Sequence, residues 1–272
     1  MPEATIRELW TYPVKGCQGV AVEAIDVSKL GIPGDRQFAV WCKGELVDQK
    51  DTPAIASIAA RYEDGDRTLT FSHAKAGELH HTVRTDGERL EAKWVLDQFT
   101  TIDQGDAAAT WLSEILNEDV RLTAPGDVWK INFPIPQMKL LHDEEKRSFF
   151  AASPVALANR ASLEDLNRQL DTPAPMDRFR MNVIVDGLEP YQEDAITSYS
   201  NGVVQLLQVT PAERCVIVTT DQKTGERKKS DLLKKMRQKP KSETFGSGRI
   251  FGSYLQVGKA GTLRVGDRLA IA

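Results

Sequence analysis

Cysteine is scarce in this chain, and the few that occur lie far apart. They stand at positions 17, 42 and 215 of 272 residues, and no two of them form a Cys-x-x-Cys pair. An odd, dispersed set argues against a disulfide framework and for a reducing compartment, so we expect a cytoplasmic protein. The absence of a cysteine cluster also disfavours an iron–sulfur centre or a structural zinc site.

The chain also lacks long apolar runs and any strong excess of charge. No stretch of about 18 apolar residues occurs, and residues 1–8 have no hydrophobic segment of the kind found in signal peptides. The formal net charge is -4, so no overall field attracts nucleic acid. We therefore expect neither a membrane partner nor a nucleic-acid partner. The length allows one large or two modest domains with proper cores.

Short β-forming runs separated by Gly and Pro turns are the dominant pattern. Hairpins are predicted around Lys43-Gly44 and across residues 72–80. Helices are predicted at 107–116, with Asp106 as N-cap, and from Ser162 onward, with Ser162 as N-cap. Further strands are predicted at 6–12, 20–27, 181–185, 203–209, 214–220, 254–257 and 268–271. The pattern indicates a mainly β fold with barrel units and peripheral helices, divided into residues 1–120 and 121–272, and an irregular loop over 125–150.

Cys215 directly follows Arg214, between two of the predicted strands. A positive charge beside a thiol favours the thiolate, which is the form that attacks electrophiles and binds soft metals. The local pattern leaves two interpretations open. One is a reactive or metal-ligating thiol, and the other is a buried cysteine that acts as a small hydrophobic residue.

Two other features have several interpretations. His80 and His81 are neighbours, so on a strand they would face opposite ways and make a poor metal site. Residues 221–241 are rich in Lys and Arg. This stretch is either a solvated helix with Leu232, Leu233 and Met236 on its buried side, or a docking surface for an acidic electron-transfer protein. A nucleic-acid surface is disfavoured because the stretch has no interleaved aromatic residues and no recognised module.

Seven separated stretches form an ordered pattern along nearly the whole chain. They are Tyr12-Pro-Val-Lys-Gly-Cys-Gln-Gly, Gly34-Asp-Arg-Gln-Phe, Ala158-Asn-Arg-Ala-Ser-Leu-Glu-Asp-Leu-Asn, Phe179-Arg-Met-Asn-Val-Ile-Val, Glu213-Arg-Cys-Val-Ile-Val-Thr-Thr-Asp-Gln-Lys-Thr-Gly, Phe251-Gly-Ser-Tyr-Leu and Gly261-Thr-Leu-Arg-Val-Gly-Asp. In their order and spacing they resemble the MOSC-domain family, specifically its amidoxime-reducing branch. The resemblance implies an N-terminal MOSC β-barrel domain, a C-terminal MOSC domain and a cofactor in the cleft between them.

The resemblance also implies a pterin-based molybdenum cofactor, with the Cys215 thiolate as the protein ligand to molybdenum. Such a cofactor ends in a phosphate, which requires fixed donors such as arginine or lysine. Tyr254 matches a family tyrosine on the molybdenum side. The residues that match the family's other cofactor contacts are Lys15, Gly16, Arg36, Ser153, Arg180, Asn182 and Arg214.

Three positions depart from the family pattern. Gly16 and Glu213 stand where serine is common, and Met181 stands where proline is usual. Glu213 would place a carboxylate near an anionic cofactor, which is unfavourable unless it points away or is paired.

The activity implied by the resemblance is reduction of N-hydroxylated compounds: hydroxylamines, amidoximes or N-hydroxylated bases. The metal would carry the redox chemistry. Because the chain has no cysteine cluster, electrons would come from a separate donor of the ferredoxin, cytochrome b5 or flavin reductase type. The alternative is a carrier or binding protein for the molybdenum cofactor, or for a persulfide on Cys215.

Overall fold

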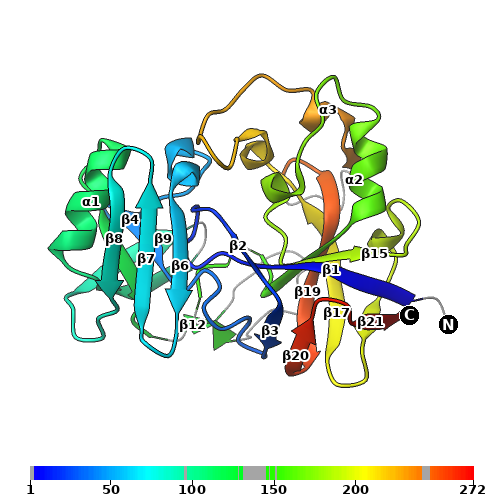
Figure 1. Cartoon of the computed structure of the whole chain (residues 1–272), viewed down its shortest axis with the longest axis horizontal. Coiled ribbons are helices and arrows are strands. Elements are labelled where there is room, and N and C mark those ends of the chain that lie inside the picture. The colour runs from blue at the N-terminus through cyan, green and yellow to red at the C-terminus, as the bar shows by residue number, and fades with distance from the viewer. Residues whose placement is uncertain are drawn as a thin grey trace.

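The fold is mainly β, as predicted, and consists of two β-rich units that lie side by side (Figure 1). The computed structural model describes residues 3–94, 97–127, 129–130, 145–146, 148–150, 152–240 and 246–272. In this part of the chain, no helix has both the length and the apolar character needed to cross a bilayer. Most of the loop predicted over 125–150 lies outside the described residues.

The first unit is a closed barrel with an additional three-stranded sheet. The barrel strands, in order around it, are β10 (Asp97–Asp103), β11 (Arg121–Pro125), β4 (Ala39–Cys42), β5 (Glu45–Leu46) and β9 (Arg89–Trp94). The sheet contains β6 (Ala59–Glu63), β7 (Thr68–His73) and β8 (Gly77–Thr82). Both predicted hairpins are therefore confirmed. Helix α1 (Asp106–Leu116) buries Trp111 and Leu112 in the same core as Phe38 and Phe71, and the short 3-10 helix η1 spans Pro53–Ser57.

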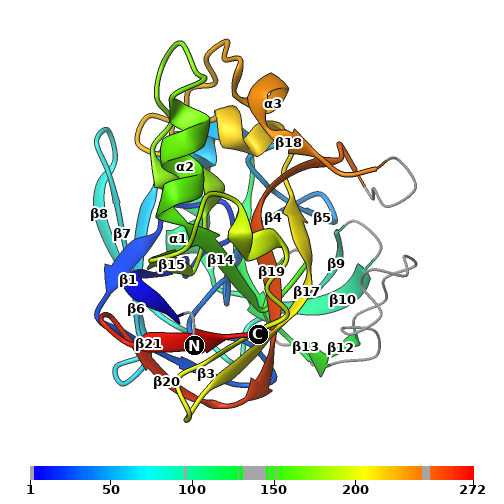
Figure 2. The ribbon, with the colours of Figure 1, turned by 90° about the vertical axis from the view of Figure 1, so that its right-hand side faces the viewer.

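The second unit is built on a nine-stranded sheet. Its strand order is β14 (Val155–Asn159), β15 (Val183–Asp186), β1 (Glu3–Thr11), β21 (Arg268–Ile271), β16 (Ser198–Ser200), β17 (Gln205–Glu213), β19 (Arg249–Lys259) and β18 (Arg237–Gln238), with β2 (Val20–Val22) paired to β1. Because β14 also pairs with β19, the sheet closes on itself into a second barrel (Figure 2). Ala4, Ile6 and Leu9 of β1 are buried in its core, and a register shift between Ile6 and Glu8 brings Leu9 to the same face as the first two.

Shorter elements complete the second unit and the surface between the units. They are the helices α2 (Arg160–Asn167) and α3 (Leu232–Lys235), the 3-10 helices η3 (Met176–Phe179), η4 (Gln192–Asp194) and η5 (Val216–Thr219), and the strand pairs β3 (Ala24–Val27) with β20 (Gly261–Arg264) and β12 (Trp129–Lys130) with β13 (Glu145–Lys146). Both helices lie at the top of the second unit in Figure 1.

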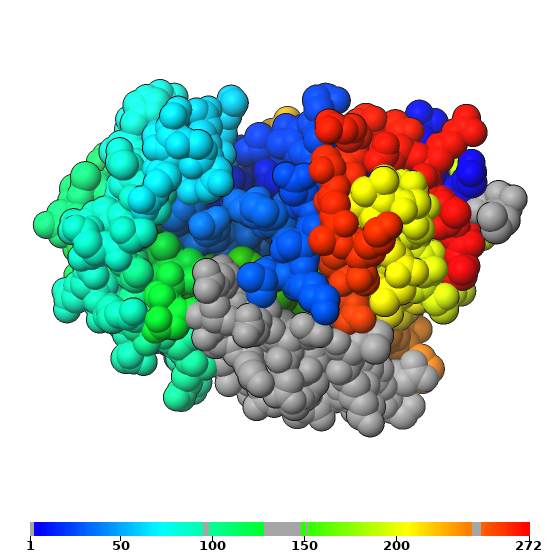
Figure 3. All heavy atoms as spheres, turned by 90° about the horizontal axis from the view of Figure 1, so that it is seen from below, coloured from blue at the N-terminus to red at the C-terminus, as the bar shows by residue number. Residues whose placement is uncertain are grey.

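Each unit contains a strand from the other side of the predicted division at residue 120. Strand β1, at the start of the chain, pairs with β15 and β21 in the second barrel, whereas β11 pairs with β4 and β10 in the first. On the face seen in Figure 3, an early segment of the chain, coloured blue, lies between the two units. After β1 the chain reaches the core of the first unit at Val14 and Cys17, returns to the second unit in β2 and β3, and enters the first barrel again at β4.

Three sequence predictions about elements were wrong. The predicted strand 214–220 is the 3-10 helix η5, because Val218 and Thr220 donate backbone hydrogen bonds to Cys215 and Ile217, three residues earlier. Helix α2 begins at Arg160 with Asn159 as its N-cap, because the Asn159 side chain accepts from the Ala161 N–H. Helix α1 has Gly105 as its N-cap, and Asp106 is its first helical residue.

Candidate functional site

One cavity between the two barrels brings together all nine residues that the sequence singled out. It measures about 170 Å³. Lys15, Gly16 and Arg36 reach it from the early segment of the chain. The residues that reach it from the second unit are Ser153, Arg180, Asn182, Arg214, Cys215 and Tyr254. The lining includes four cationic side chains against the carboxylates of Asp48 and Glu213. The cavity is therefore suited to an anionic ligand.

Arg36 and Arg180 both have left-handed backbones, with φ of +48° and +54°. Residues other than glycine adopt this conformation at a cost, and it is concentrated at functional sites. The predicted strand that carried Arg180 and Asn182 begins only at Val183, and Arg180 instead ends the 3-10 helix η3. The turn, rather than strand alternation, directs both side chains to the cavity.

A buried carboxylate holds this corner of the site together. Asp35 is 3% exposed and forms an ion pair with Arg36. Its Oδ1 accepts hydrogen bonds from the Asn182 Nδ2 at 3.2 Å and from the Tyr12 backbone N–H at 2.7 Å. The Arg36 Nη2 in turn donates to the Arg180 carbonyl oxygen at 2.9 Å. Asp35 thereby orients one cation of the cavity and ties the first segment of the chain to the second unit.

Arg214 and Cys215 lie where β17 ends and η5 begins. The Arg214 backbone N–H donates to the Arg249 carbonyl at 2.7 Å, and one terminal nitrogen of its guanidinium donates to the Phe179 carbonyl. Its Nε is buried and has no hydrogen-bond partner among the described residues. Cys215 is exposed at the cavity, whereas Cys17 is buried and its burial raises the pKa of that thiol to about 12. The thiol available for chemistry at this cavity is therefore that of Cys215.

Comparison with known proteins finds matches to two family models, which together cover most of the chain. Residues 3–119 match the MOSC N-terminal beta barrel domain, and residues 144–270 match the MOSC domain. The chain belongs to the MOSC-domain family.

Its relatives include the human mitochondrial amidoxime-reducing component 1, which is 29% identical over 97% of this chain and 81% of that protein. The human mitochondrial amidoxime reducing component 2 is 28% identical over 97% of this chain and 82% of that protein. Among solved structures, the YUAD protein from Bacillus subtilis matches 98% of this chain and 94% of its own, with a TM-score of 0.43 and 10% identity.

Lys15 and Gly16, which line the same cavity, form a tight turn. Lys15 is 8% exposed, and its Nζ lies 3.5 Å from the centroid of the Trp94 ring. Gly16 has φ of +86°, and a Cβ there would meet Ile55 at 3.0 Å, so glycine fits this position without strain. The Gly16 carbonyl accepts from the Gln49 Nε2 at 2.6 Å, which fixes the turn against the cavity wall.

The structure accommodates the other two departures from the family pattern, Glu213 and Met181, without an uncompensated charge or a steric conflict. The Glu213 Oε2 accepts hydrogen bonds from the backbone N–H groups of Gly246 at 2.9 Å and Gly248 at 3.2 Å, so its charge is compensated by fixed donors. Met181 is 1% exposed and packs in the core beneath α2 and α3. Its carbonyl oxygen accepts from the Tyr12 hydroxyl at 3.1 Å.

Ser153 and Tyr254 are held by backbone groups. The Ser153 hydroxyl lies within hydrogen-bond distance of the Val155 carbonyl, at 3.0 Å, and of the Leu255 carbonyl. The Tyr254 hydroxyl donates to the Glu213 carbonyl at 3.2 Å, which places its ring at the cavity beside the Arg214-Cys215 segment.

Sequence reasoning missed several residues that hold the side chains and turns of the cavity in place. Tyr12, Asp35 and Gln222 all lie inside the matched stretches, but nothing in their local pattern marked them. Gln49 lies outside those stretches, and it exchanges two amide hydrogen bonds with Gln222, at 2.8 and 3.0 Å. Such reciprocal pairs across a domain boundary have no sequence signature, because they depend on two distant loops meeting.

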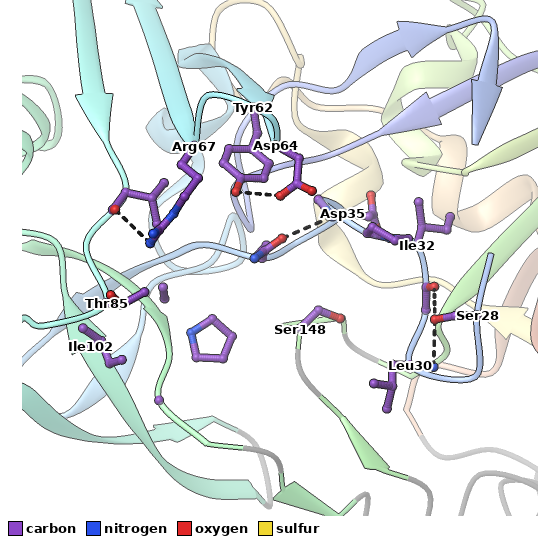
Figure 4. A pocket seen from close by; sticks show the side chains of 18 of the residues that line it. Ser28, Leu30, Ile32, Asp35, Tyr62, Asp64, Arg67, Thr85, Ile102 and Ser148 are labelled. Carbon is purple, nitrogen blue, oxygen red and sulfur yellow. Dashed lines mark hydrogen bonds between the residues drawn. The ribbon is translucent and has the colours of Figure 1, made fainter. Parts of the chain in front are cut away.

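A larger cavity of about 650 Å³ lies next to this site (Figure 4). It shares the loop that contains Asp35, and is also lined by Arg67 and Asp64. Among the described residues that line it, carboxylates outnumber arginines and none is a cysteine, so its size alone does not make it the anion site. We assign the site to the smaller cavity because it combines the cations with the exposed thiol.

Proposed function

We propose that this protein is a molybdenum-cofactor-dependent reductase of N-hydroxylated compounds: hydroxylamines, amidoximes or N-hydroxylated bases. The observation that carries this proposal is the exposed thiol of Cys215 at a cavity lined by four cationic side chains from both barrels. The relatives named as amidoxime-reducing components support the choice of substrate class.

The residues of the cavity fit the proposed cofactor. A pterin cofactor is anionic at its phosphate, and Lys15, Arg36 and Arg180 are the donors suited to that end. The buried Nε of Arg214 has no partner among the described residues, and an acceptor on a ligand would satisfy it. The Cys215 thiolate, directly beside it, is a ligand type that suits molybdenum.

The chemistry divides between cofactor and protein. When bound, the cofactor supplies a metal that exchanges two electrons. Reduction of R–NHOH consumes two electrons and two protons and releases R–NH2 and water. Arg36 and Arg180 would bind the negatively charged phosphate of the cofactor. The buried side chains of Phe150 and Val218 keep water from the inner wall of the cavity. Tyr254, oriented through its hydroxyl, lines the cavity with Cys215 and would limit how a substrate is placed there.

The test begins with the wild-type chain, expressed in a host that makes the cofactor. We expect near-stoichiometric molybdenum and pterin, measured by mass spectrometry. We also expect reduction of an amidoxime and a hydroxylamine with reduced methyl viologen as the electron source. Protein free of both molybdenum and pterin, or loaded protein that reduces neither compound, would refute the proposal. Persulfide sulfur on Cys215 without molybdenum would instead support the carrier function.

The electron donor is proposed to be a separate, acidic protein. Helix α3 packs against η5, the turn that follows Cys215, and its Lys234 and Lys235 are exposed. Among the described residues, the solvated helix predicted over 221–241 is reduced to this single turn. Leu232 and Met236 are buried as expected, whereas Leu233 is only half-buried. A negatively charged donor bound at this turn would lie close to the proposed metal ligand.

Charge reversal at Lys234 and Lys235 is expected to slow turnover with reduced cytochrome b5 about tenfold at low salt, because exposed charges mainly set the association rate. Turnover with methyl viologen should be unchanged. A matched control reverses Lys29 and Lys75, which are exposed elsewhere, and should leave both rates unchanged. Equal slowing in the two double variants, or sustained turnover with no donor at all, would contradict this docking site.

A further inference from the structure

Tyr12 contacts two of the three arginines that line the cavity, Arg36 and Arg180, although it does not line the cavity itself. The guanidinium carbon of Arg36 and that of Arg180 each lie 4.5 Å from the centroid of the Tyr12 ring. The negative face of an aromatic ring attracts cations, and more strongly where water is excluded. Tyr12 is 2% exposed, so both contacts are shielded from solvent.

The backbone of Tyr12 fixes the segment that presents Arg36. The Arg36 N–H donates to the Tyr12 carbonyl at 2.6 Å, and the Tyr12 N–H donates to the Asp35 carboxylate at 2.7 Å. These two bonds hold the left-handed backbone of Arg36, which would otherwise relax toward a less strained conformation.

The hydroxyl of Tyr12 reaches the segment that presents Arg180. It donates to the carbonyl oxygen of Met181, which stands between Arg180 and Asn182. The Arg180 Nη1 donates to the Cys17 carbonyl at 2.5 Å and to the Gln222 Oε1 at 3.1 Å, both on one side of the guanidinium. One residue thus contacts both cation-bearing segments through its backbone, its ring and its hydroxyl.

The two guanidinium groups have like charges that must be held together. Burial, followed by the charge of Arg36, lowers the pKa of Arg180 to about 10. Asp35 is ion-paired with Arg36, whereas Arg180 has no ion pair with a carboxylate among the described residues. The pair therefore retains an excess of positive charge that an anion would neutralise.

We propose that Tyr12 is a positioning residue that holds Arg36 and Arg180 together as one binding site for a phosphate group. The proposal rests on the proposed function only in taking this phosphate to be that of the cofactor. The ring keeps the two like-charged side chains in place before the anion arrives, so binding does not have to bring them together.

The experiment titrates inorganic phosphate into the full chain, made in a host without the cofactor, by calorimetry at constant ionic strength. Tyr12→Leu removes the ring and is expected to weaken phosphate binding about tenfold. Tyr12→Phe keeps the ring and should restore affinity to within about twofold of wild type. Tyr62→Leu is the matched control, because Tyr62 packs against Phe38 and contacts neither arginine.

A second variant covers the case in which Tyr12→Leu fails to fold. A Cβ on Gly19 would lie 2.5 Å from the Tyr12 ring, so Gly19→Ala displaces the ring without removing it and should weaken phosphate binding in the same direction. Wild-type affinity in both Tyr12→Leu and Gly19→Ala, or equal loss in Tyr62→Leu, overturns the positioning role.

The outcome is separable from that of the proposed function. If wild-type protein holds no molybdenum but Tyr12→Leu still weakens phosphate binding, the positioning role stands and the reductase function fails. If loaded wild-type protein no longer binds added phosphate, the occupant is the cofactor's own phosphate. Phosphate binding that persists in loaded protein would overturn that assignment and identify free phosphate as the ligand.

Discussion

Replacing Cys215 by alanine is expected to reduce molybdenum content to background and N–O reduction at least a hundredfold. The described cavity offers one exposed thiol, and the other two cysteines are buried or half-buried elsewhere. Without a thiolate, the protein would lose its covalent hold on the metal, while the arginines would still attract the pterin phosphate. Metal and pterin should therefore be measured separately, by mass spectrometry and by fluorescence of the released pterin.

The matched control is Cys42→Ala, which removes a half-buried thiol on the first barrel and should change neither quantity. Cys215→Ser tests the donor atom, because it keeps a similar size but replaces the soft sulfur with oxygen. We expect Cys215→Ser to behave like alanine in turnover. Full molybdenum content and activity in Cys215→Ala would show that the metal has another ligand and would remove the central residue of the proposed site.

Replacing Glu193 by glutamine is expected to stabilise the protein above neutral pH. Glu193 is fully buried, and burial raises the pKa of its carboxyl to about 7 from an ordinary value of 4.5. Its Oε2 accepts a hydrogen bond from the Ser162 hydroxyl at 2.8 Å, while its Oε1 has no partner among the described residues. The neighbouring Asp194 charge further disfavours ionisation, and the nearby Tyr199 hydroxyl is also buried without a described partner.

The sign of the effect follows from proton binding. Between pH 4.5 and 7 the unfolded chain ionises this carboxyl while the folded chain keeps it protonated. Stability is therefore lost as the pH rises through this window, by up to about 3 kcal/mol above it. Glu193→Gln removes this loss, so it should exceed wild type in unfolding free energy at pH 8 and show little gain at pH 4.

Urea unfolding of both proteins at several pH values measures this difference. Glu189→Gln, on the exposed surface nearby, should follow the wild-type curve throughout. Parallel pH profiles for wild type and Glu193→Gln would show that Glu193 is ionised at little cost in the folded protein, and would contradict the prediction.

Local sequence patterns were enough to predict much of the fold. Alternation and turn residues located the two hairpins of the first unit, and apolar spacing located α1 to within one residue. Patterns of this kind work where the chain's neighbours in space are also its neighbours in sequence. The order and spacing of short motifs further placed the chain in its family, because Lys15, Arg36, Arg180 and Cys215 each lie in a stretch that could be matched.

Tertiary structure alone decided the backbone that presents these residues. Val216-Ile-Val-Thr has the β-branched composition of a strand, yet it forms η5, because Val218 packs in the core shared with Phe179 and α3. Arg180 turns out of η3 instead of lying on a strand, and β1 crosses to the second barrel.

The sequence by itself determined which side chains carry charge and which carries a thiol, together with most of the strands that bring them close. Only the tertiary structure decided that Tyr12 lies against Arg36 and Arg180, that Gln49 meets Gln222, and that Glu213 is compensated by the N–H groups of Gly246 and Gly248. The physical reason is that these contacts join residues remote in sequence. Their free energy depends on burial and on fixed partners, which exist only once these distant segments have packed together in the folded chain.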